Sequence, residues 1–398
     1  MRKHKGRTTI RRPMGVRRVK FSNAVPVIKF IVLIAGVAIG VLAMIFFGFP
    51  LIEDLVKGVD PSLRYQPKIE ANFELNENFV VEKNSEASEI FIEDMDFKVN
   101  VKNEPYIDGQ NIIFTTRKER KNSFQLDAVV LYHTADKTAR VLPNVEKKYD
   151  NLLSPVLSGN LAVWIDSMTN GGGRIVGYDI EKEEQFVIKE YAYAMPALSI
   201  SGNYLAFMQW AGDTTQRLYV YDVAKREATT VKLYETTVGN SAVDISPYDM
   251  VWAEYNKDGE GVLKRVAFGE EESKYDNYDF GKQVYEPKTN GKDIVFATSK
   301  DVISGNLMLS TDGGPPVLIA ENVVNYDIGD GFVAYTKDNR IHIAYAKANK
   351  QVMLTSDITK NLLASVVGNG VCYYDVTDAS VADEIVMYTT VDELTGEE

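Results

Sequence analysis

A short phrase recurs seven times after residue 100, and this repeat constrains the fold more than any other feature of the sequence. In each copy a turn residue is followed five positions later by an aromatic residue that closes an apolar run. Successive aromatics lie 38 to 50 residues apart. The copies span residues 109–114, 159–164, 202–207, 247–252, 291–296, 330–335 and 368–373. Repeats of about 40–50 residues made of short strands and Gly-rich turns are typical of four-stranded propeller blades.

The repeat therefore predicts an all-β fold, a β-propeller with seven four-stranded blades; the irregular ends leave six or eight blades open. A blade cannot bury its apolar face alone, so neighbouring blades must pack together. We expect the repeated aromatics to fill the space between blades, which makes Trp164 and Trp252 core residues and not a sugar-stacking platform. Trp210 lies outside the repeated position and is a candidate for surface contact.

The last copy supplies only three strands, so the ring needs one more strand from elsewhere. A strand from residues 77–101, in the stretch NENFVVEK or DFKVNVK, is expected to complete this blade. Closure of this kind protects the edges of the sheet.

Residues 30–49 form an uncharged stretch of 20 residues, FIVLIAGVAIGVLAMIFFGF. As a helix it spans roughly 30 Å, the thickness of a bilayer core. A cleaved signal peptide is the competing interpretation, but its apolar part is usually only about 7–15 residues and ends in small residues. We expect one transmembrane helix over residues 30–50. It follows a basic, disordered tail (1–29) and precedes a linker (51–68), the propeller (69–392) and an acidic end (393–398).

Orientation follows from charge. Residues 1–52 contain ten Lys and Arg and no Asp or Glu, and positive flanks stay in the cytoplasm. The propeller is therefore expected outside the cell membrane. Gly36 and Gly40 form a G-x-x-x-G pair, a candidate helix–helix contact through which the chain would form a homodimer.

The remainder of the chain is strongly acidic, with 34 basic against 56 acidic residues and a net charge of −22. Such a body does not favour nucleic acid as a partner, because phosphate binding needs a basic face. Cys372 is the single cysteine, so an intramolecular disulfide is ruled out. An exported domain without disulfides suits a Gram-positive-type bacterium.

Few residues fit a catalytic or metal site. The sequence lacks G-x-S-x-G, and beyond the tail only His133 and His342 remain, both expected as ordinary strand residues. Cys372 lies in an apolar phrase and is expected to be a buried, inert thiol. We predict no catalytic residue, no metal site and no cofactor. The carboxylates of residues 258–260 and 327–330 are expected in solvated turns, with calcium as the alternative.

One basic loop stands out on the acidic body. Arg117, Lys118, Arg120 and Lys121 lie within residues 117–121, in the longest interval between repeats. They are candidates for contact with an anionic lipid surface or wall polymer, against the alternative of a plain solvated hairpin.

Two phrases resemble the TolB-like propeller repeats of bacterial envelope proteins. Residues 196–207 (PALSISGNYLAF) are similar to the P-x-x-S-x-x-G-x-x-(I/L)-A-F phrase of that family, and residues 310–314 (STDGG) to its S-x-D-G-G turn. The resemblance implies a platform that binds other envelope proteins. The Tol partnership itself is not implied, because TolB is a soluble periplasmic protein and this chain is expected to be tethered.

The leading functional hypothesis is a membrane-tethered, extracytoplasmic propeller that acts as an interaction module for a protein, peptide or envelope glycan, including the case in which it signals through its tail. One alternative is a propeller-based glycan hydrolase or lyase. A cluster of carboxylates, Tyr and Arg converging at the channel mouth would favour that enzyme. The other alternative is a structural subunit of an envelope complex, which a broad apolar patch would favour.

Overall fold

The computed structural model describes the propeller and leaves the N-terminal region outside its described part. The described residues are 87–90, 92, 99, 101–118, 125–211, 215–235, 242–255, 260–268, 275–277, 283–299, 305–345, 349–355, 358–378 and 385–391. The chain divides into two units, Met1–Arg64 and Tyr65–Glu398, and all described residues belong to the second. Within that described part, no helix is long and apolar enough to cross a membrane. The segment 30–50 and the pair Gly36 and Gly40 lie outside it.

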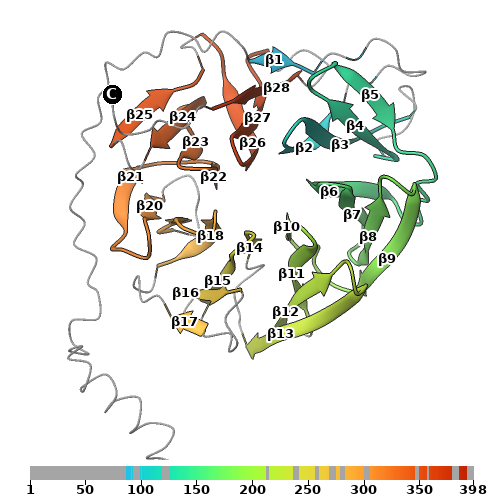
Figure 1. Ribbon diagram of the computed structural model, residues 1–398, viewed down its shortest axis with the longest axis horizontal. Helices are drawn as coiled ribbons and strands as arrows, with labels where there is room; N and C mark the ends of the chain where they lie inside the picture. The colour runs from blue at the N-terminus through green and yellow to red at the C-terminus, as the bar shows by residue number, and fades with distance from the viewer. Residues whose placement is uncertain are drawn as a thin grey trace, which may run out of the picture. The chain divides into compact units, whose positions relative to one another are not determined.

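Seven antiparallel sheets of four strands are arranged in a ring (Figure 1). The first four blades are built from consecutive strands: β2 (Asn103–Asp108), β3 (Asn111–Thr116), β4 (Ala128–His133) and β5 (Thr138–Val141); β6 (Asn151–Ser158), β7 (Leu161–Ser167), β8 (Gly173–Asp179) and β9 (Glu184–Tyr191); β10 (Leu198–Ser201), β11 (Tyr204–Trp210), β12 (Thr215–Asp222) and β13 (Glu227–Glu235); β14 (Val243–Ile245), β15 (Asp249–Tyr255), β16 (Gly261–Ala267) and β17 (Tyr275–Asn277). Within each blade the first strand lies innermost, and the chain zigzags outward (Figure 1).

The last three blades continue the same order. Their strands are β18 (Tyr285–Thr289), β19 (Ile294–Ala297), β20 (Leu307–Ser310) and β21 (Val317–Ala320); β22 (Tyr326–Ile328), β23 (Val333–Lys337), β24 (Arg340–Tyr345) and β25 (Lys350–Met353); β26 (Asn361–Val367), β27 (Gly370–Asp375), β28 (Ile385–Thr390) and β1 (Ser88–Glu89). The fold is thus an all-β, seven-bladed propeller, which confirms the predicted class and excludes six or eight blades.

The ring is closed by β1, which pairs antiparallel with β28 as the outermost strand of the seventh blade. Ser88 lies opposite Tyr388, and Ile90 donates its backbone N–H to the carbonyl of Val386 at 2.8 Å. The closing strand therefore comes from residues 77–101 as predicted, but from neither stretch named for it. In each blade a turn joins the first strand to the second, and we call it the inner turn. In the seventh blade β27 begins at this turn and β28 returns toward it. Because β1 is antiparallel to β28, it runs away from that turn. The chain therefore enters the blade from the face that carries these turns.

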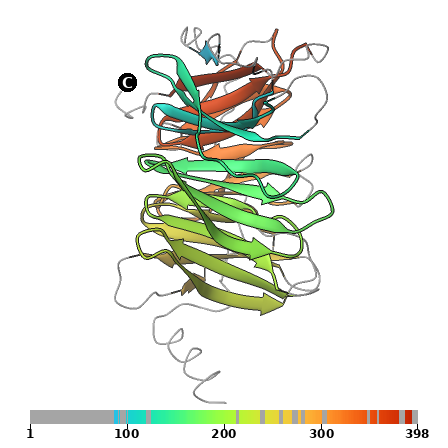
Figure 2. The same ribbon diagram turned by 90° about the vertical axis from the view of Figure 1, so that its right-hand side faces the viewer.

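The core consists of seven apolar clusters, one at each junction between neighbouring blades. Each repeated aromatic lies on the second strand of its blade and packs against the preceding blade. Trp164 and Trp252 are fully buried, which confirms them as core residues. Seen from the side, the strands of successive blades stack across these junctions (Figure 2).

Candidate functional site

One position of the innermost strand, three residues before the first residue of the inner turn, links four of the blades to the blade that follows. In four blades its side chain accepts a hydrogen bond from a backbone N–H of the following blade, always the residue two before that blade's turn. These bonds run from Ile245 to Ser199 Oγ (3.1 Å), from Thr289 to Asp244 Oδ2 (2.8 Å), from Val366 to Asp327 Oδ2 (3.0 Å) and from Ile107 to Ser365 Oγ (3.1 Å). We call this contact the inter-blade latch.

The other three blades hold Tyr106, Val156 and Lys288 at this position. Each of these residues follows an irregularity in the pairing of its inner strand, and the residue two positions earlier has positive φ: Glu104 (51°), Ser154 (49°) and Glu286 (46°). Bulges of this kind change the direction of the side chains that follow them. The inner strands of these blades therefore depart from the latch geometry, and the amide of Ile328, which follows Lys288's blade, bonds to Asp327 Oδ1 at 3.0 Å.

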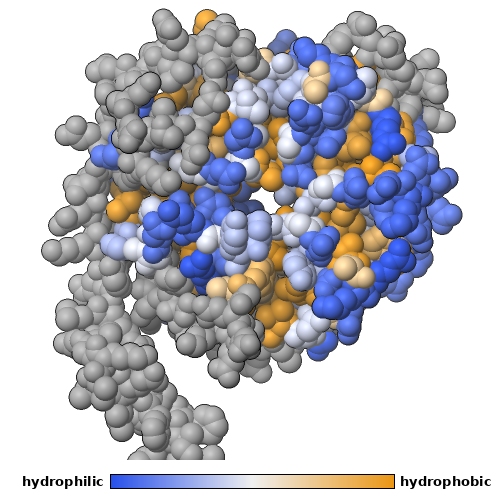
Figure 3. All heavy atoms as spheres, in the orientation of Figure 1, coloured by the Kyte–Doolittle hydropathy of each residue, from blue (hydrophilic) through white to orange (hydrophobic). Residues whose placement is uncertain are grey.

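The central channel widens into a cavity of about 360 Å³ on the side of the inner turns. All seven blades contribute to its lining through the ends of the inner strands and their turns. The polar and charged side chains that line it are Tyr106, Asp108, Ser158, Ser199, Ser201, Asp244, Ser246, Lys288, Thr289, Asn290, Asp327 and Asp330. Along the ring axis, the surface is hollowed at its centre (Figure 3).

Lys288 and Asp327 line both this cavity and a second one of about 360 Å³, which is lined by residues of the fifth, sixth and seventh blades. We call the position of these two residues the waist of the channel. The ammonium of Lys288 lies 3.7 Å from Asp244 Oδ1, and its side chain is 30% exposed. Burial tends to lower the pKa of Lys288, but the charges of Asp244, Asp327 and Glu286 outweigh it and raise the pKa above its usual value. Lys288 is therefore a cation at any physiological pH and not a nucleophilic amine.

For the carboxyl of Asp327, the effect of burial on the pKa exceeds that of the neighbouring cation. Burial raises the pKa of its carboxyl to about 6, with the charge of Asp244 adding to the effect and Lys288 opposing it. Burial also raises the pKa of the Tyr106 phenol, and the charges of Asp327, Asp244 and Asp108 raise it further. The Tyr106 hydroxyl thus lies within the field of three carboxylates of the cavity.

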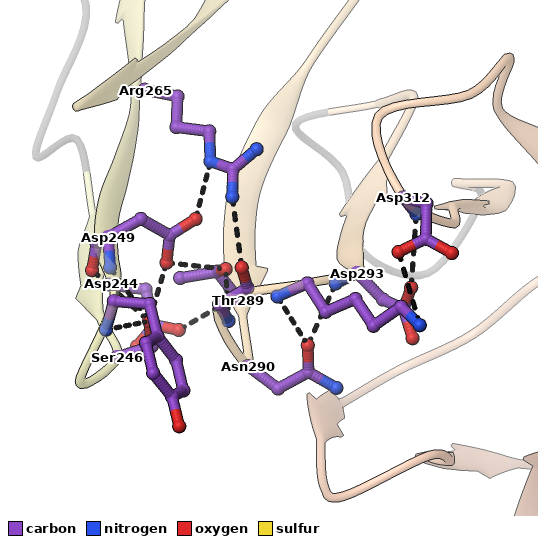
Figure 4. Close-up of polar contacts among 11 residues, drawn as sticks. Asp244, Ser246, Asp249, Arg265, Thr289, Asn290, Asp293 and Asp312 are labelled. Atoms are coloured by element: carbon purple, nitrogen blue, oxygen red, sulfur yellow. Dashed lines mark hydrogen bonds and ion pairs between the residues drawn. The ribbon is translucent and has the colours of Figure 1, made fainter. Parts of the chain in front are cut away.

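The strand that carries Lys288 is fixed by a buried network at the junction of the fourth and fifth blades (Figure 4). The carboxylate of Asp249, which is inaccessible to solvent, accepts hydrogen bonds from Ser246 Oγ at 2.6 Å and Thr289 Oγ1 at 2.9 Å. Its other oxygen accepts from Arg265 Nε at 2.5 Å, and Arg265 in turn donates to the carbonyl of Gly291 at 2.9 Å. A buried charge held this way keeps its partners in one arrangement, so the neighbour of Thr289 in sequence, Lys288, is held at the waist.

Three of the surface candidates named from the sequence, Arg117, Lys118 and Trp210, lie at the opposite end of the blades from the cavity. Arg117 and Lys118 follow the outer end of β3, and Lys118 donates its backbone N–H to Asp127 Oδ1 at 2.8 Å. Trp210 is the half-buried last residue of β11, two blades away. Arg120 and Lys121 lie outside the described residues. The structure does not bring these candidates together, and their contact role stays a prediction.

The two histidines and the cysteine lie in strands, as expected. His133 bonds through Nδ1 to Asp136 Oδ1 at 2.9 Å, and the ring of His342 stacks on Tyr335 with centroids 5.2 Å apart. Burial lowers the pKa of His342 and raises the pKa of the fully buried Cys372 thiol. Across the described part of the chain, no group of three or more His, Cys, Asp or Glu is placed to hold a metal ion.

The expectation that residues 327–330 form a solvated turn was wrong for its first member. Asp327 belongs to β22 and accepts the latch hydrogen bond from the next blade, whereas Asp330 lies in the turn and is exposed. The strand β22 has only three residues, and their burial does not alternate, so no strand pattern distinguished Asp327 from a turn residue in the sequence.

The cavity residues Tyr106, Asp244 and Lys288 were not singled out from the sequence, and Asp327 was named only as a turn carboxylate. A usable signal existed, because all four stand three residues before the repeated turn residue. An alignment of the seven repeats that includes the three residues before each turn places the channel-lining positions in one column.

Comparison with known proteins supports the fold and no closer relationship. No protein-family model matches the chain. No curated protein matches it either. Among solved structures, the β-propeller domain of the Trilobed protease from Pyrococcus furiosus is similar with a TM-score of 0.56 and 14% identity, covering 75% of this chain and 97% of that one. That domain is described as having an open velcro topology, whereas here β1 closes the ring.

Two further solved structures show weaker similarity. The acylaminoacyl peptidase of Pyrococcus horikoshii matches with a TM-score of 0.51 and 11% identity over 70% of this chain and 49% of its own length. TolB from Acinetobacter baumannii matches with a TM-score of 0.44 and 12% identity over 70% of this chain and 64% of its own. At these identities the similarity to the two Pyrococcus structures supports the β-propeller fold alone, and function must be argued from the site.

Proposed function

We propose that this chain is a membrane-anchored interaction module, with its propeller outside the membrane and the mouth of its channel as the binding face for a protein or peptide segment. The observation that carries the proposal is the cavity of about 360 Å³, which all seven blades line and in which charged side chains converge. Binding sites are usually concave and orient their ligands with a few polar groups.

The anchor is the uncharged segment 30–49, with ten cations before it and acidic residues directly after it. The contact of residues 117–121 with lipid or wall polymer, and pairing of two chains through Gly36 and Gly40, remain parts of this proposal.

The test is site-specific photo-crosslinking in intact cells that express the full-length chain. Tyr248 is 68% exposed and lies in the turn beside the cavity, whereas Tyr193 is 49% exposed and lies between β9 and β10, at the opposite end of the blades. Each is replaced in turn by p-benzoylphenylalanine, which keeps an aromatic side chain. The proposal expects a discrete crosslinked partner from position 248 and not from position 193. Crosslinks from position 193 alone, or none from position 248, would overturn it.

A glycan hydrolase or lyase is the second candidate, because Asp108, Asp244, Asp327 and Tyr106 converge in the cavity. Opposing it, Asp244 and Asp327 already accept latch hydrogen bonds, and the raised pKa of Tyr106 makes its phenol a poor base. Turnover of purified cell-wall glycan by the full-length protein, lost on substitution of Asp108 by Asn, would favour the enzyme over the interaction module.

A further inference from the structure

The cavity carries an uneven charge. Among the described residues that line it there are four carboxylates, those of Asp108, Asp244, Asp327 and Asp330, and one basic residue, Lys288. Lys288 is already matched, because its ammonium lies 3.7 Å from Asp244 and the charges of Asp244 and Asp327 both raise its pKa. The cavity therefore has acidic capacity beyond what its own cation satisfies.

The carboxylates are not equally committed to the fold. Asp244 and Asp327 serve the latch, and Asp108 Oδ2 accepts the backbone N–H of Gly159 at 2.8 Å. Asp330 is exposed in its turn, and its Oδ2 lies 3.6 Å from where a side chain on Gly368 would begin. Because Gly368 has no side chain, that residue makes no side-chain contact with this exposed carboxylate.

A phenol and an aromatic rim complete the site. Within the described part of the chain, the hydroxyl of Tyr106 makes no hydrogen bond, although it lies in the field of three carboxylates. Next to the lining residue Pro247, the ring of Tyr248 is 68% exposed and lies over Gly291, where a Cβ would be 2.5 Å from its Cδ2. An exposed aromatic beside a cavity offers its face to a neighbouring side chain or to a cation.

We propose that the channel mouth binds a polypeptide segment through a Lys or Arg side chain that enters the cavity toward Asp330 and Asp108, while the adjoining part of the segment packs on Tyr248. The inference rests on the proposed interaction function and names its ligand chemistry. An acidic segment would meet four carboxylates, and the single ammonium that could attract it is held by Asp244. A Lys or Arg side chain is attracted by the unmatched carboxylates and can donate a hydrogen bond to the Tyr106 hydroxyl oxygen.

The experiment measures binding of two labelled probe peptides to the full-length protein in phosphatidylcholine nanodiscs. One probe is an acetylated, amidated decapeptide with three Lys spaced by Ala and Tyr, and the other has Glu in place of each Lys. Fluorescence anisotropy at about 50 and 150 mM salt gives the dissociation constants. We expect the Lys peptide to bind about tenfold more tightly than the Glu peptide, with a preference that shrinks as salt rises.

Two cavity variants should shift the affinity for the Lys peptide in opposite directions. Asp330→Asn removes a carboxylate and should weaken binding about 2–5-fold, the usual size for an exposed charge pair. Lys288→Met removes the competing cation and should tighten it. The matched controls are Lys292→Met and Asp312→Asn, which make the same charge changes in an exposed ion pair of 3.2 Å that is not part of the cavity lining. Neither control should change the affinity by more than about twofold.

Equal or tighter binding of the Glu peptide would overturn the inference, as would control variants that shift the affinity as much as the cavity variants do. If Lys288→Met fails to fold in a thermal melt, Asp330→Lys replaces it and must abolish the preference for the Lys peptide. If position 248 crosslinks to a partner but the protein shows no preference for the Lys peptide, this inference is wrong and the proposed function is still supported. Failure of the crosslink itself would count against both.

Discussion

Substitution of Asp327 by Asn should change the pH dependence of stability, and the size of the change follows from its site. Burial raises the pKa of this carboxyl from 3.8 to about 6. Below pH 4 the group is protonated in both the folded and the unfolded chain. Between about pH 4 and 6 the unfolded chain has lost the proton and the folded chain still holds it, so the free energy of unfolding falls as pH rises. About two pKa units at 1.36 kcal/mol each amount to roughly 3 kcal/mol.

The Asn variant lacks this titration. It also loses one of two acceptors, because Asp327 receives the backbone N–H groups of both Val366 and Ile328, at a cost of about 1 kcal/mol at every pH. The prediction is therefore tested by how the difference in free energy of unfolding between the variant and the wild type changes with pH, and not by its value at one pH. Relative to the wild type, the variant should gain roughly 3 kcal/mol of unfolding free energy between pH 4 and pH 7, which corresponds to about 3–5 °C in Tm for a unit of this size.

Thermal unfolding of the two full-length proteins, followed at half-unit steps from pH 4 to pH 8, measures this difference. Asp312→Asn is the control, since it removes the same charge from an acidic chain at a side chain that is 62% exposed. A constant Tm difference between the Asp327 variant and the wild type across this range would refute the assigned burial of the carboxyl. A deficit of the variant that widens as pH rises would show instead that Lys288 dominates the electrostatics of this carboxyl.

Three further outcomes are expected. Trp252→Ala should lower the free energy of unfolding by about 3–5 kcal/mol in denaturant titrations, because a fully buried ring between the third and fourth blades is lost. Ser199→Ala should cost about 1–3 kcal/mol, since it leaves the latch N–H of Ile245 unpaired, whereas Ser201→Ala on the same strand should cost under about 0.5 kcal/mol in the same titration. The thiol of Cys372 should stay unreactive toward a thiol reagent at pH 8 until denaturant is added, because burial raises its pKa and blocks access.

The fold was predictable because each repeat has a turn residue followed five positions later by an aromatic residue. An aromatic five residues after the turn lies on the second strand and faces the preceding blade, so one periodic pattern determines both the blade count and the core. The closing strand was less predictable. Ser88–Glu89 has only two paired residues and a polar sequence, and its place depends on β28 beside it, not on any strand propensity of its own.

The site could be predicted only in part. Placing Asp244, Lys288 and Asp327 around one channel requires the ring, since more than 80 residues separate the first from the last. The irregularities before Tyr106 and Lys288 could not be predicted at all. They place Glu104 and Glu286 at positive φ, a conformation for which local sequence preference would favour Gly or Asn.

The latch gives a reason to regard Lys288 as functional and not as an accident of drift. The four blades that form it use side chains of two kinds, Ser and Asp, and each satisfies a backbone amide that would otherwise face the channel. A lysine at the same position gives up that bond and holds a partly desolvated ammonium, and both of these cost stability. Two neighbouring carboxylates offset part of this cost, but Ser or Asp would have avoided it. We infer that Lys288 is retained to offset the carboxylates of the cavity and to limit its affinity for basic side chains, because stability alone would favour replacement of this lysine.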